Sequence, residues 1–282
     1  MIISEKRKDL RQILDPLQQG EKSLGFVPTM GALHEGHLSL IKKALHENAY
    51  VVVSIFVNPT QFDNGADLEK YPRTLERDLD LLKSVSDDII VYAPSDKDIY
   101  GDKVASEHLN FDGLEHQMEG KFRPGHFDGV GTIVKRLFEI VKPDVAYFGL
   151  KDFQQFKIIE KLVEKQQLPI KIEGCEIFRE PDGLAMSSRN ERLSKPEREA
   201  APFIYKTLQH ARALFGTESA TKVVDWVKEE FEKNKILKLE YFIIADEDTL
   251  QPIQNKSETK SYRAFIAAFA NDVRLIDNIA LN

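Results

Sequence analysis

The sequence predicts an α/β fold in which a doubly wound parallel sheet is followed by a smaller α+β domain. Apolar, β-branched runs alternate with segments whose apolar residues recur at helical spacing. The continuous apolar run at 50–57 is typical of a strand buried on both faces, as in parallel sheets. After Phe178 the order changes to helices followed by strands. We therefore expect a Rossmann-like domain at residues 1–177 and a C-terminal α+β lid domain at residues 178–282.

In the first domain, strand and helix patterns alternate along the chain. The expected strands are 24–29, 50–57, 88–94, 144–149 and 168–178. The expected helices are 37–47, 71–85, 130–141 and 152–166. Pro72 is expected near the start of the second helix, where a missing N–H is tolerated. In the second domain we expect helices at 196–215 and 219–233, then strands at 239–246, 261–270 and 273–281.

Charge and cysteine content restrict the function. The net charge of −7 argues against a general binder of nucleic acid or anionic membranes. Cys175 is the single cysteine, so no intrachain disulfide can form, and its apolar surroundings in the sequence predict a buried structural thiol rather than a nucleophile. The N-terminus has no apolar signal region, and no run reaches the ~18 apolar residues of a membrane span. These features predict a cytoplasmic protein.

Two histidines stand where the first expected strand meets its helix. In a doubly wound sheet, ligands bind beyond the carboxyl ends of the strands. His34 and His37 lie there, three residues apart, with Gly31 and Gly36 allowing close approach of a ligand to the backbone. A helix N-terminus favours anions, and imidazoles can donate hydrogen bonds to phosphate oxygens. The alternatives are ordinary surface histidines or a zinc site, although the spacing is not that of H-E-x-x-H.

Two amides follow the most apolar strand at the same expected sheet edge. Asn58 and Gln61 can each donate and accept hydrogen bonds, which suits hydroxyl groups and a carboxylate that must stay reactive. The plain alternative is a loop with Asn-Pro turn chemistry.

Three further segments carry candidate residues. In 147–155, Gly149 ends a strand, Lys151 suits a polyphosphate, Asp152 can cap a helix, and Gln155 lies on the first helical turn. The polar loop 182–190 can close over a polyphosphate or serve as an interdomain linker. The glycine-rich segment 120–132, which contains Arg123 and His126, is open to two interpretations, a mobile flap and a structural connection.

Taken together, the segments resemble the pantothenate synthetase (pantoate–β-alanine ligase) family. The matching stretches appear in order as PTMGALHEGH, SIFVNPTQF, YPRTLERDL, RPGHFDGVGTIVKRLF, FGLKDFQQ and REPDGLAMSSRN. The resemblance covers most of residues 20–195; the last 85 or so agree in layout more than in motif. The H-x-G-H element alone marks a wider superfamily of nucleotidyltransferases, whereas VNPTQF with REPDGLAMSSRN is specific to this family.

The resemblance implies ATP-dependent amide formation in two steps. Pantoate's carboxylate attacks the α-phosphorus of ATP to give pantoyl adenylate and pyrophosphate, and β-alanine then displaces AMP to give pantothenate. His37, the family's proton donor, His34 and Lys151 would be catalytic; Gln61 would contact pantoate and β-alanine, and Gln155 and Asn58 pantoate. The implied ATP-binding residues are Met30, Gly31, Ala32, Leu33, His34, Glu35, Gly36, His37, Gly149, Leu150, Lys151, Asp152, Phe178, Met186, Ser187, Ser188 and Arg189.

The resemblance also implies Mg²⁺, and usually a homodimer. Asp78 and Asp80 are candidate magnesium ligands, but the ERDLD segment also fits a solvated helix face. Phe178 stands where the family carries a small β-branched residue near adenine, so the adenine pocket would be reshaped unless the contact is made by the backbone. Two rival functions remain open from the residues alone: a nucleotidyltransferase acting on a phosphate, and a nonenzymatic nucleotide-binding module.

Overall fold

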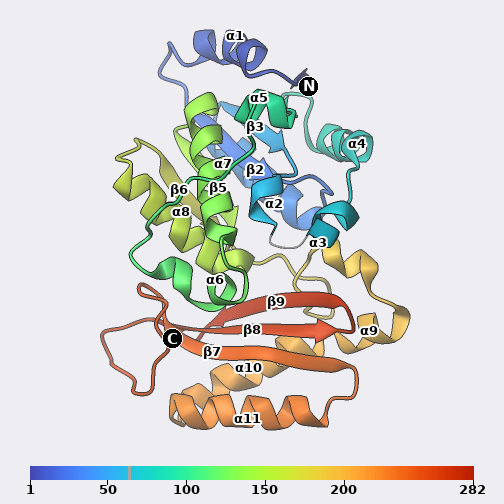
Figure 1. The fold of residues 1–282 in the computed structure, drawn as a ribbon, viewed down its shortest axis with the longest axis vertical. Helices are drawn as coiled ribbons and strands as arrows, with labels where there is room; N and C mark the ends of the chain where they lie inside the picture. The colour runs from blue at the N-terminus through green and yellow to red at the C-terminus, as the bar shows by residue number, and fades with distance from the viewer. Residues whose placement is uncertain (63–64) are drawn as a thin grey trace. The chain divides into compact units, whose positions relative to one another are not determined.

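The computed structural model describes residues 1–62 and 65–282, and the chain folds into two compact units (Figure 1). The first unit comprises Met1–Leu150 and Gln154–Glu176. The second comprises Lys151–Phe153 and Ile177–Asn282.

The first unit is built on a parallel sheet with the strand order β1-β4-β3-β2-β5-β6. Its strands are β1 Ile2–Ser4, β2 Leu24–Thr29, β3 Tyr50–Ile55, β4 Ile90–Tyr92, β5 Val145–Gly149 and β6 Lys171–Cys175. The chain moves outward from β2 through β3 to β4 and then resumes at β5 on the other side, so β2 and β5 flank the switch point. The predicted doubly wound parallel sheet is confirmed. β1 was not predicted, because it is short and flanked by charged residues.

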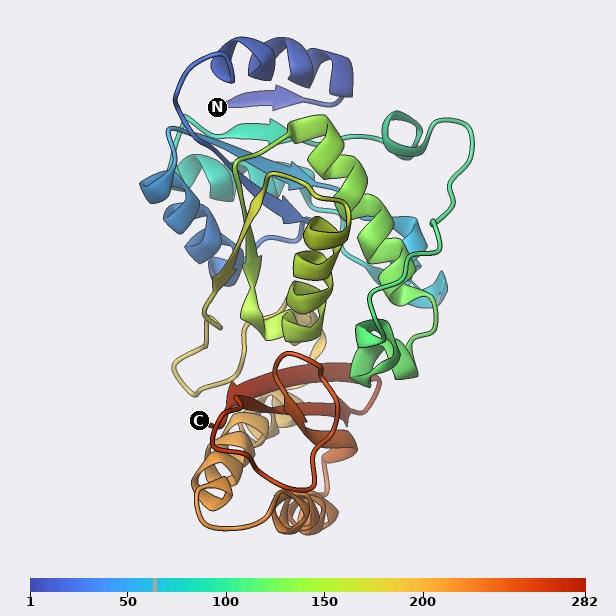
Figure 2. The same ribbon diagram turned by 90° about the vertical axis from the view of Figure 1, so that its left-hand side faces the viewer.

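Helices cover both faces of this sheet, as Figure 2 shows. The longer ones are α1 Arg7–Leu17, α2 Glu35–Glu47, α4 Leu75–Val85, α7 His126–Val141 and α8 Phe153–Lys165. Shorter turns are η1 Pro59–Gln61, α3 Gly65–Lys70, α5 Asp96–Tyr100, η2 Leu114–His116, α6 Met118–Phe122 and η3 Leu150–Asp152. α2 packs on the sheet because Leu38, Ile41 and Ala44 recur on one side and are buried in a core cluster with Val51 and Val53.

The pairing of β2 with β5 stops well before the carboxyl edge. Its ladder ends at Phe26 and Ala146, whereas β2 stays paired with β3 as far as Thr29. The Thr29 carbonyl accepts a hydrogen bond from Phe56, so Thr29 faces β3 and Pro28, one residue earlier, faces β5. Since proline has no N–H, the ladder to β5 lacks a donor at this point.

Two predicted helices begin or continue differently from expectation. The helix expected at 71–85 begins only at Leu75, after Pro72 and Thr74. The helix expected at 130–141 begins four residues earlier, at His126, so α6 and α7 occupy most of the glycine-rich segment 120–132. A Cβ on Gly120 would lie 1.8 Å from the Glu115 carbonyl oxygen, so this glycine permits close packing. The interpretation as a structural connection is favoured over a mobile flap.

The second unit contains the antiparallel sheet β7 Leu237–Asp246, β8 Tyr262–Ala270 and β9 Val273–Ala280. Its helices are η4 Ser188–Arg192, α9 Lys195–Ala200, α10 Phe203–Phe215 and α11 Ala220–Lys233, and α10 and α11 pack against the sheet (Figure 1). The single helix expected at 196–215 is interrupted at Ala201 and Pro202, since proline cannot donate the next helical hydrogen bond. The predicted small α+β domain is otherwise confirmed.

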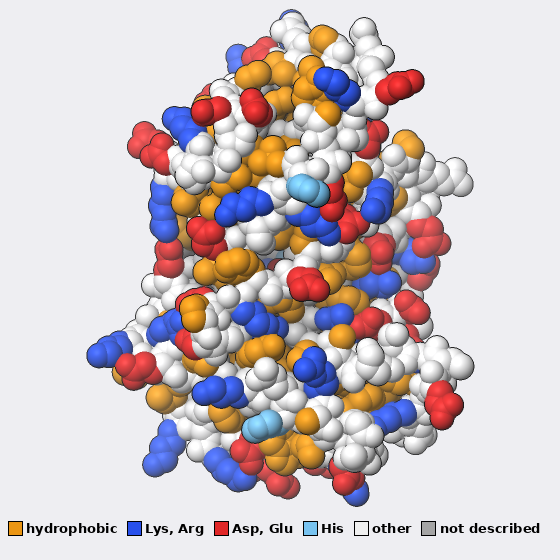
Figure 3. Space-filling model, turned by 180° about the vertical axis from the view of Figure 1, so that it is seen from behind, with side chains coloured by type: hydrophobic (Ala, Val, Ile, Leu, Met, Phe, Trp, Pro, Cys, Tyr) orange, Lys and Arg blue, Asp and Glu red, His pale blue; other side chains and the backbone are white. Residues whose placement is uncertain are grey.

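Charged side chains of both signs are interspersed over the face seen in Figure 3. Among the residues described, none of the helices combines the length and apolarity needed to cross a membrane.

Candidate active site

The loop between β2 and α2 has an unusual backbone that a buried carboxylate holds in place. Gly31 and Ala32 have φ values of +76° and +50°, in the left-handed region. The backbone N–H of Ala32 donates to Asp78 Oδ2 at 3.0 Å, and that of Leu33 donates to Asp78 Oδ1 at 2.8 Å. Asp78, on α4, is fully buried. The solvated-face interpretation of ERDLD is therefore wrong for Asp78, whereas the Asp80 side chain is 80% exposed.

His34 and His37 lie together at the start of α2. Their ring centroids are 4.0 Å apart, and their planes differ by 31°. His34 immediately precedes the helix, and its N–H donates to Nδ1 of His37 at 3.3 Å. Because Nδ1 accepts, the neutral His37 ring carries its proton on Nε2. His37 thus closes the first turn of the helix.

Asn58 and Gln61 form one hydrogen-bonded group beyond the end of β3. Asn58 Nδ2 donates to Gln61 Oε1 and to the Gly129 carbonyl, each at 3.2 Å. The Asn58 oxygen accepts from the Tyr100 hydroxyl and from Thr60. Asn58 is only 1% exposed, so its amide is fully used in holding the loop. It positions Gln61 and does not itself face solvent.

Gln61 is also held by neighbours from two other segments, the loop after β2 and the stretch with Arg123 and His126. Its Nε2 points to the sulfur of Met30, which brings the loops after β2 and β3 together. The backbone carbonyl oxygen of Gln61 lies 2.8 Å from Nδ1 of His126 and accepts from the Arg123 guanidinium at 3.4 Å. His126 is buried at the start of α7.

The segment after β5 divides between the two units. Gly149 ends β5 and Leu150 follows it within the first unit, as does Gln155, which is partly buried on α8. The neighbouring Gln154 is 3% exposed; its side-chain oxygen accepts from the Glu119 N–H, and its amide nitrogen donates to the Leu114 and Gln117 carbonyls. Gln154 therefore anchors the start of α8.

The remaining candidates lie in the second unit. Lys151 and Asp152 form a loose ion pair of 3.8 Å, and the Lys151 carbonyl accepts from Asn278 at 2.9 Å. Phe178 is 40% exposed, and its carbonyl accepts from the Met186 N–H at 3.0 Å. Ser187 caps η4 by accepting from the Arg189 N–H, and Ser188 begins that turn.

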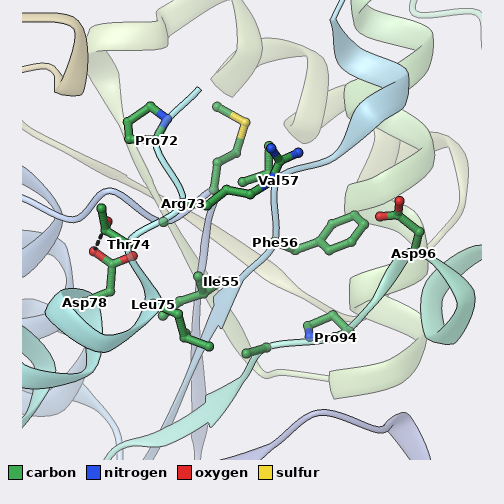
Figure 4. A pocket seen from close by; sticks show the side chains of 13 residues that line it. Ile55, Phe56, Val57, Pro72, Arg73, Thr74, Leu75, Asp78, Pro94 and Asp96 are labelled. Atoms are coloured by element: carbon green, nitrogen blue, oxygen red, sulfur yellow. Dashed lines mark hydrogen bonds between the residues drawn. The ribbon is translucent and has the colours of Figure 1, made fainter. Parts of the chain in front are cut away.

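A cavity of about 350 Å³ opens at the carboxyl edge of β2, β3 and β4 in the first unit. It is lined by Met30 and Gly31 among the predicted ATP-binding residues, and by Asp78. Figure 4 shows the hydrogen bond between Thr74 and Asp78 on one side of this cavity and Asp96 on the other.

Metal ligands and thiol chemistry find little support in the described residues. Within residues 1–62 and 65–282, no group of three or more His, Cys, Asp or Glu side chains could hold a metal ion. Both carboxylate oxygens of Asp78 accept hydrogen bonds from backbone N–H groups, which argues against Asp78 as a magnesium ligand. Cys175 is buried, and burial raises the pKa of its thiol to about 11, so the predicted structural role is supported.

Sequence reasoning did not assign roles to His126, Arg123, Tyr100 and Gly129, although all four touch the Asn58–Gln61 group. The RPGHFDG stretch was the available signal for three of them. Tyr100 lay in the segment without a readable pattern.

The parallel sheet, with polar loops and a helix N-terminus at its carboxyl edge, defines an α/β fold of the kind in which enzymes bind ligands beyond the strand ends. The profile of the family "Pantoate-beta-alanine ligase" matches residues 2–280, and the chain belongs to this family. It is therefore a ligase that condenses pantoate with β-alanine, using ATP, to form pantothenate with release of AMP and pyrophosphate.

Relatives and solved structures agree over the whole chain. The pantothenate synthetase of Flavobacterium psychrophilum is 59% identical over 281 residues, and that of Christiangramia forsetii 56% over 282, with 100% of both chains covered in each case. The crystal structure of the Thermus thermophilus enzyme matches with a TM-score of 0.91 at 38% identity, covering 100% of this chain and 99% of that one. The Francisella tularensis ligase, complexed with β,γ-ATP and β-alanine, matches with a TM-score of 0.80 at 38% identity, covering 100% of this chain and 98% of that one.

Proposed function

We propose that the first unit binds the phosphates of ATP at the start of α2 and pantoate beside Gln61. A pantoate carboxylate oxygen then bonds to the α-phosphorus while the bond from that phosphorus to the bridging oxygen breaks and pyrophosphate leaves. The amine of β-alanine next bonds to the acyl carbon, AMP leaves and the amine loses a proton. The observation that carries this proposal is the pairing of His34 with His37 at a helix N-terminus on the carboxyl edge of the sheet.

His37 is the proposed donor to the departing phosphates. With Nδ1 accepting from the backbone, its Nε2–H is the group that can donate to a ligand. The negative charge that develops on the leaving oxygen is stabilised by such a fixed donor and by the positive end of the helix dipole. His34, Glu35 and Gly36 complete the proposed contact surface. The side chain of Leu33 lies in the core, and the N–H groups of Ala32 and Leu33 bond to Asp78, so these two N–H groups do not serve the phosphates.

Gln61 is the proposed contact for pantoate and for β-alanine, with Gln155 as a second contact for pantoate. The amides can hold hydroxyl and carboxylate groups without neutralising the nucleophile's charge. Asn58 is better placed as a positioning residue for Gln61 than as a direct contact, since its own hydrogen bonds are all made within the protein.

In the second unit, the proposed ATP contacts are Lys151, Asp152, Phe178 and the run Met186–Arg189. Lys151 would supply a mobile positive charge for the phosphates. The Phe178 carbonyl accepts a hydrogen bond from the Met186 N–H, and the Phe178 side chain is 40% exposed. Since this side chain is not packed in the core, a contact between the backbone here and adenine would tolerate its size.

Three expectations stay predictions: a requirement for Mg²⁺ and a homodimer, which rest on the family, and a cytoplasmic location, which rests on the sequence features. Mg²⁺ usually keeps several waters and is held largely by substrate phosphates, which fits a protein whose described residues offer no ligand cluster. When bound with ATP it would neutralise phosphate charge.

Single-turnover release of pyrophosphate tests the proposed roles. We expect His37→Ala and Lys151→Ala each to lower the rate roughly 10²-fold, as removal of one preorganised donor does elsewhere. His46→Ala is the matched control for the first variant, because His46 lies exposed on the same helix. Rates near that of the control in both variants would remove the proposed roles.

The lid role of the second unit is also a proposal. An acyl adenylate hydrolyses readily, so water must be kept from it. We expect ATP with pantoate to slow limited proteolysis within residues 182–190. Equal cleavage rates with and without these ligands would count against closure.

A further inference from the structure

The left-handed turn after β2 forms a small anion-binding concavity, and a protein side chain already fills it. Successive backbone N–H groups that converge in such a conformation form a nest for a negative charge. Here the converging groups are the N–H of Ala32 and the N–H of Leu33, and both bond to the carboxylate of Asp78. A phosphate therefore cannot use these two donors while Asp78 is in place.

The Asp78 carboxylate is itself fixed by burial and by a side-chain hydrogen bond. Asp78 is fully buried, and Thr74 Oγ1 lies 3.3 Å from its Oδ1 within the first turn of α4. A buried carboxylate is costly unless its oxygens accept hydrogen bonds, so the fold keeps the loop and α4 together. The fit is also tight, because a Cβ on Gly31 would lie 3.0 Å from Asp78 Oδ2 and 3.1 Å from Ile55.

The two bonded residues lead directly into the histidine pair. Ala32 adopts φ +50°, which an alanine rarely does, and the bond from its N–H to Asp78 compensates for that conformation. The side chain of Leu33 lies in the core, and the N–H of His34, the next residue, donates to Nδ1 of His37. The direction in which the chain enters α2 is thus fixed from α4.

We infer that Asp78 is a positioning residue for the adenylation step, which fills the nest of Ala32 and Leu33 and thereby places His34 and His37 against the phosphates of ATP. This inference rests on the proposed role of the histidine pair. Misplacement of a catalytic group by about 1 Å can cost on the order of 10²-fold in rate. Pyrophosphate has left before the amide forms, so the effect falls on the first step.

The test compares the two half-reactions in Asp78→Asn. Its amide keeps the size of the carboxyl group but turns an NH₂ toward one of the two N–H donors. Formation of pyrophosphate from ATP and pantoate in a single turnover should slow at least about tenfold. Release of AMP when β-alanine is added to enzyme-bound pantoyl adenylate should stay within about threefold, a split that general damage to the fold does not produce.

Two further variants make the test decisive. Glu76→Gln changes an exposed carboxylate on the same helix and should leave both half-reactions unaltered. Asp78→Glu keeps the charge and both acceptor oxygens but shifts them by one methylene. It should slow adenylation selectively, and it decides the matter should Asp78→Asn not fold. Equal slowing of both steps, or adenylation as fast as in Glu76→Gln, would overturn the inference. His37→Ala separates the two ideas: if it slows adenylation and the Asp78 variants do not, only the role of Asp78 fails.

Discussion

The imidazoles of His34 and His37 lie 4.0 Å apart, and the His34 backbone N–H is bonded to the ring of His37. One side chain therefore closes the first turn of α2 and carries the nitrogen proposed as donor to the phosphates. The geometry of the helix start and the tautomer of the proposed donor are set by the same hydrogen bond.

This double role predicts that stability and activity separate in His37→Ala. Loss of one N-terminal helix bond should cost about 1 kcal/mol. For a chain of this size that lowers Tm by roughly 2–4 °C. Differential scanning calorimetry beside the pyrophosphate assay measures both quantities. A Tm drop many times larger would mean that lost activity reflects unfolding.

Tyr100 and Asn58 test how firmly Gln61 must be held. Burial raises the pKa of Tyr100, so its hydroxyl is a neutral donor to Asn58. Tyr100→Phe should lower the free energy of unfolding by about 1 kcal/mol, since Asn58 still accepts from Thr60. Asn58→Ala should lower it by about 2–3 kcal/mol, because several buried groups lose their hydrogen-bond partner. We expect Asn58→Ala to raise the KM for pantoate more than that for ATP. An equal rise in both KM values would argue against a role specific to Gln61.

Gly129 permits the contact of α7 with η1. A Cβ there would lie 2.2 Å from the Thr60 carbonyl oxygen and 2.7 Å from Gln61 Cα, both backbone atoms that cannot turn away. Gly129→Ala should therefore destabilise the protein by about 1–3 kcal/mol in urea unfolding and raise the KM for pantoate. Gly20→Ala is the control, because a Cβ at Gly20 meets nothing within 4 Å. Equal stability of the two variants would show that α7 can shift away from η1 at little cost in free energy.

Cys175 predicts a pH effect of definite sign. Burial raises the pKa of its thiol to about 11 in the folded chain, above the ~8.5 of an unfolded cysteine. The folded state thus favours the neutral thiol: its contribution is complete below about pH 8.5 and is lost as pH rises through about 11. Unfolding free energies of the natural chain and Cys175→Ala, compared between pH 8 and 11, should converge. A difference independent of pH would contradict this.

In the second unit, Arg179 and Asp277 form a two-pronged ion pair, with nitrogen–oxygen distances of 2.7 and 3.0 Å. Asp277 is only 4% exposed, so Asp277→Ala leaves the charge of Arg179 without its partner and should cost about 3–5 kcal/mol. Asp272→Ala, which breaks an exposed pair with Arg192, should cost at most about 1 kcal/mol. Thermal unfolding of both variants is the measurement, and similar losses would show that the buried pair contributes little.

The sequence was most informative where the pattern of apolar residues indicates a single type of secondary structure. β2, β3 and β5 are apolar runs that end in polar or glycine residues, so both the sheet and the edge that carries the candidate site could be predicted. His34 and Gln61 follow two of those strand ends, and Gly149 is the last residue of β5. Their placement at that edge needed only the rule that parallel strands end on one side of the sheet.

Features that depend on contacts between distant segments could not be predicted. Helical spacing shows which residues share a face of α4, but not that a loop about 45 residues earlier places two N–H groups on Asp78. Gly129 was taken with its neighbours as part of a possible flap, although its absent side chain serves a helix contact. The interruption of the predicted helix at Pro202 did have a signal, which the strong helical pattern around it outweighed.

Pro28 limits how far the two central strands can pair. Its nitrogen carries no hydrogen, so one of the hydrogen bonds that would extend the β2–β5 ladder cannot form, and the ladder ends at Phe26 and Ala146. Ligands in folds of this kind bind beyond the strand ends at the switch point, which β2 and β5 flank. Because pairing already stops short of that edge, a ligand arriving there has no strand pairing to break.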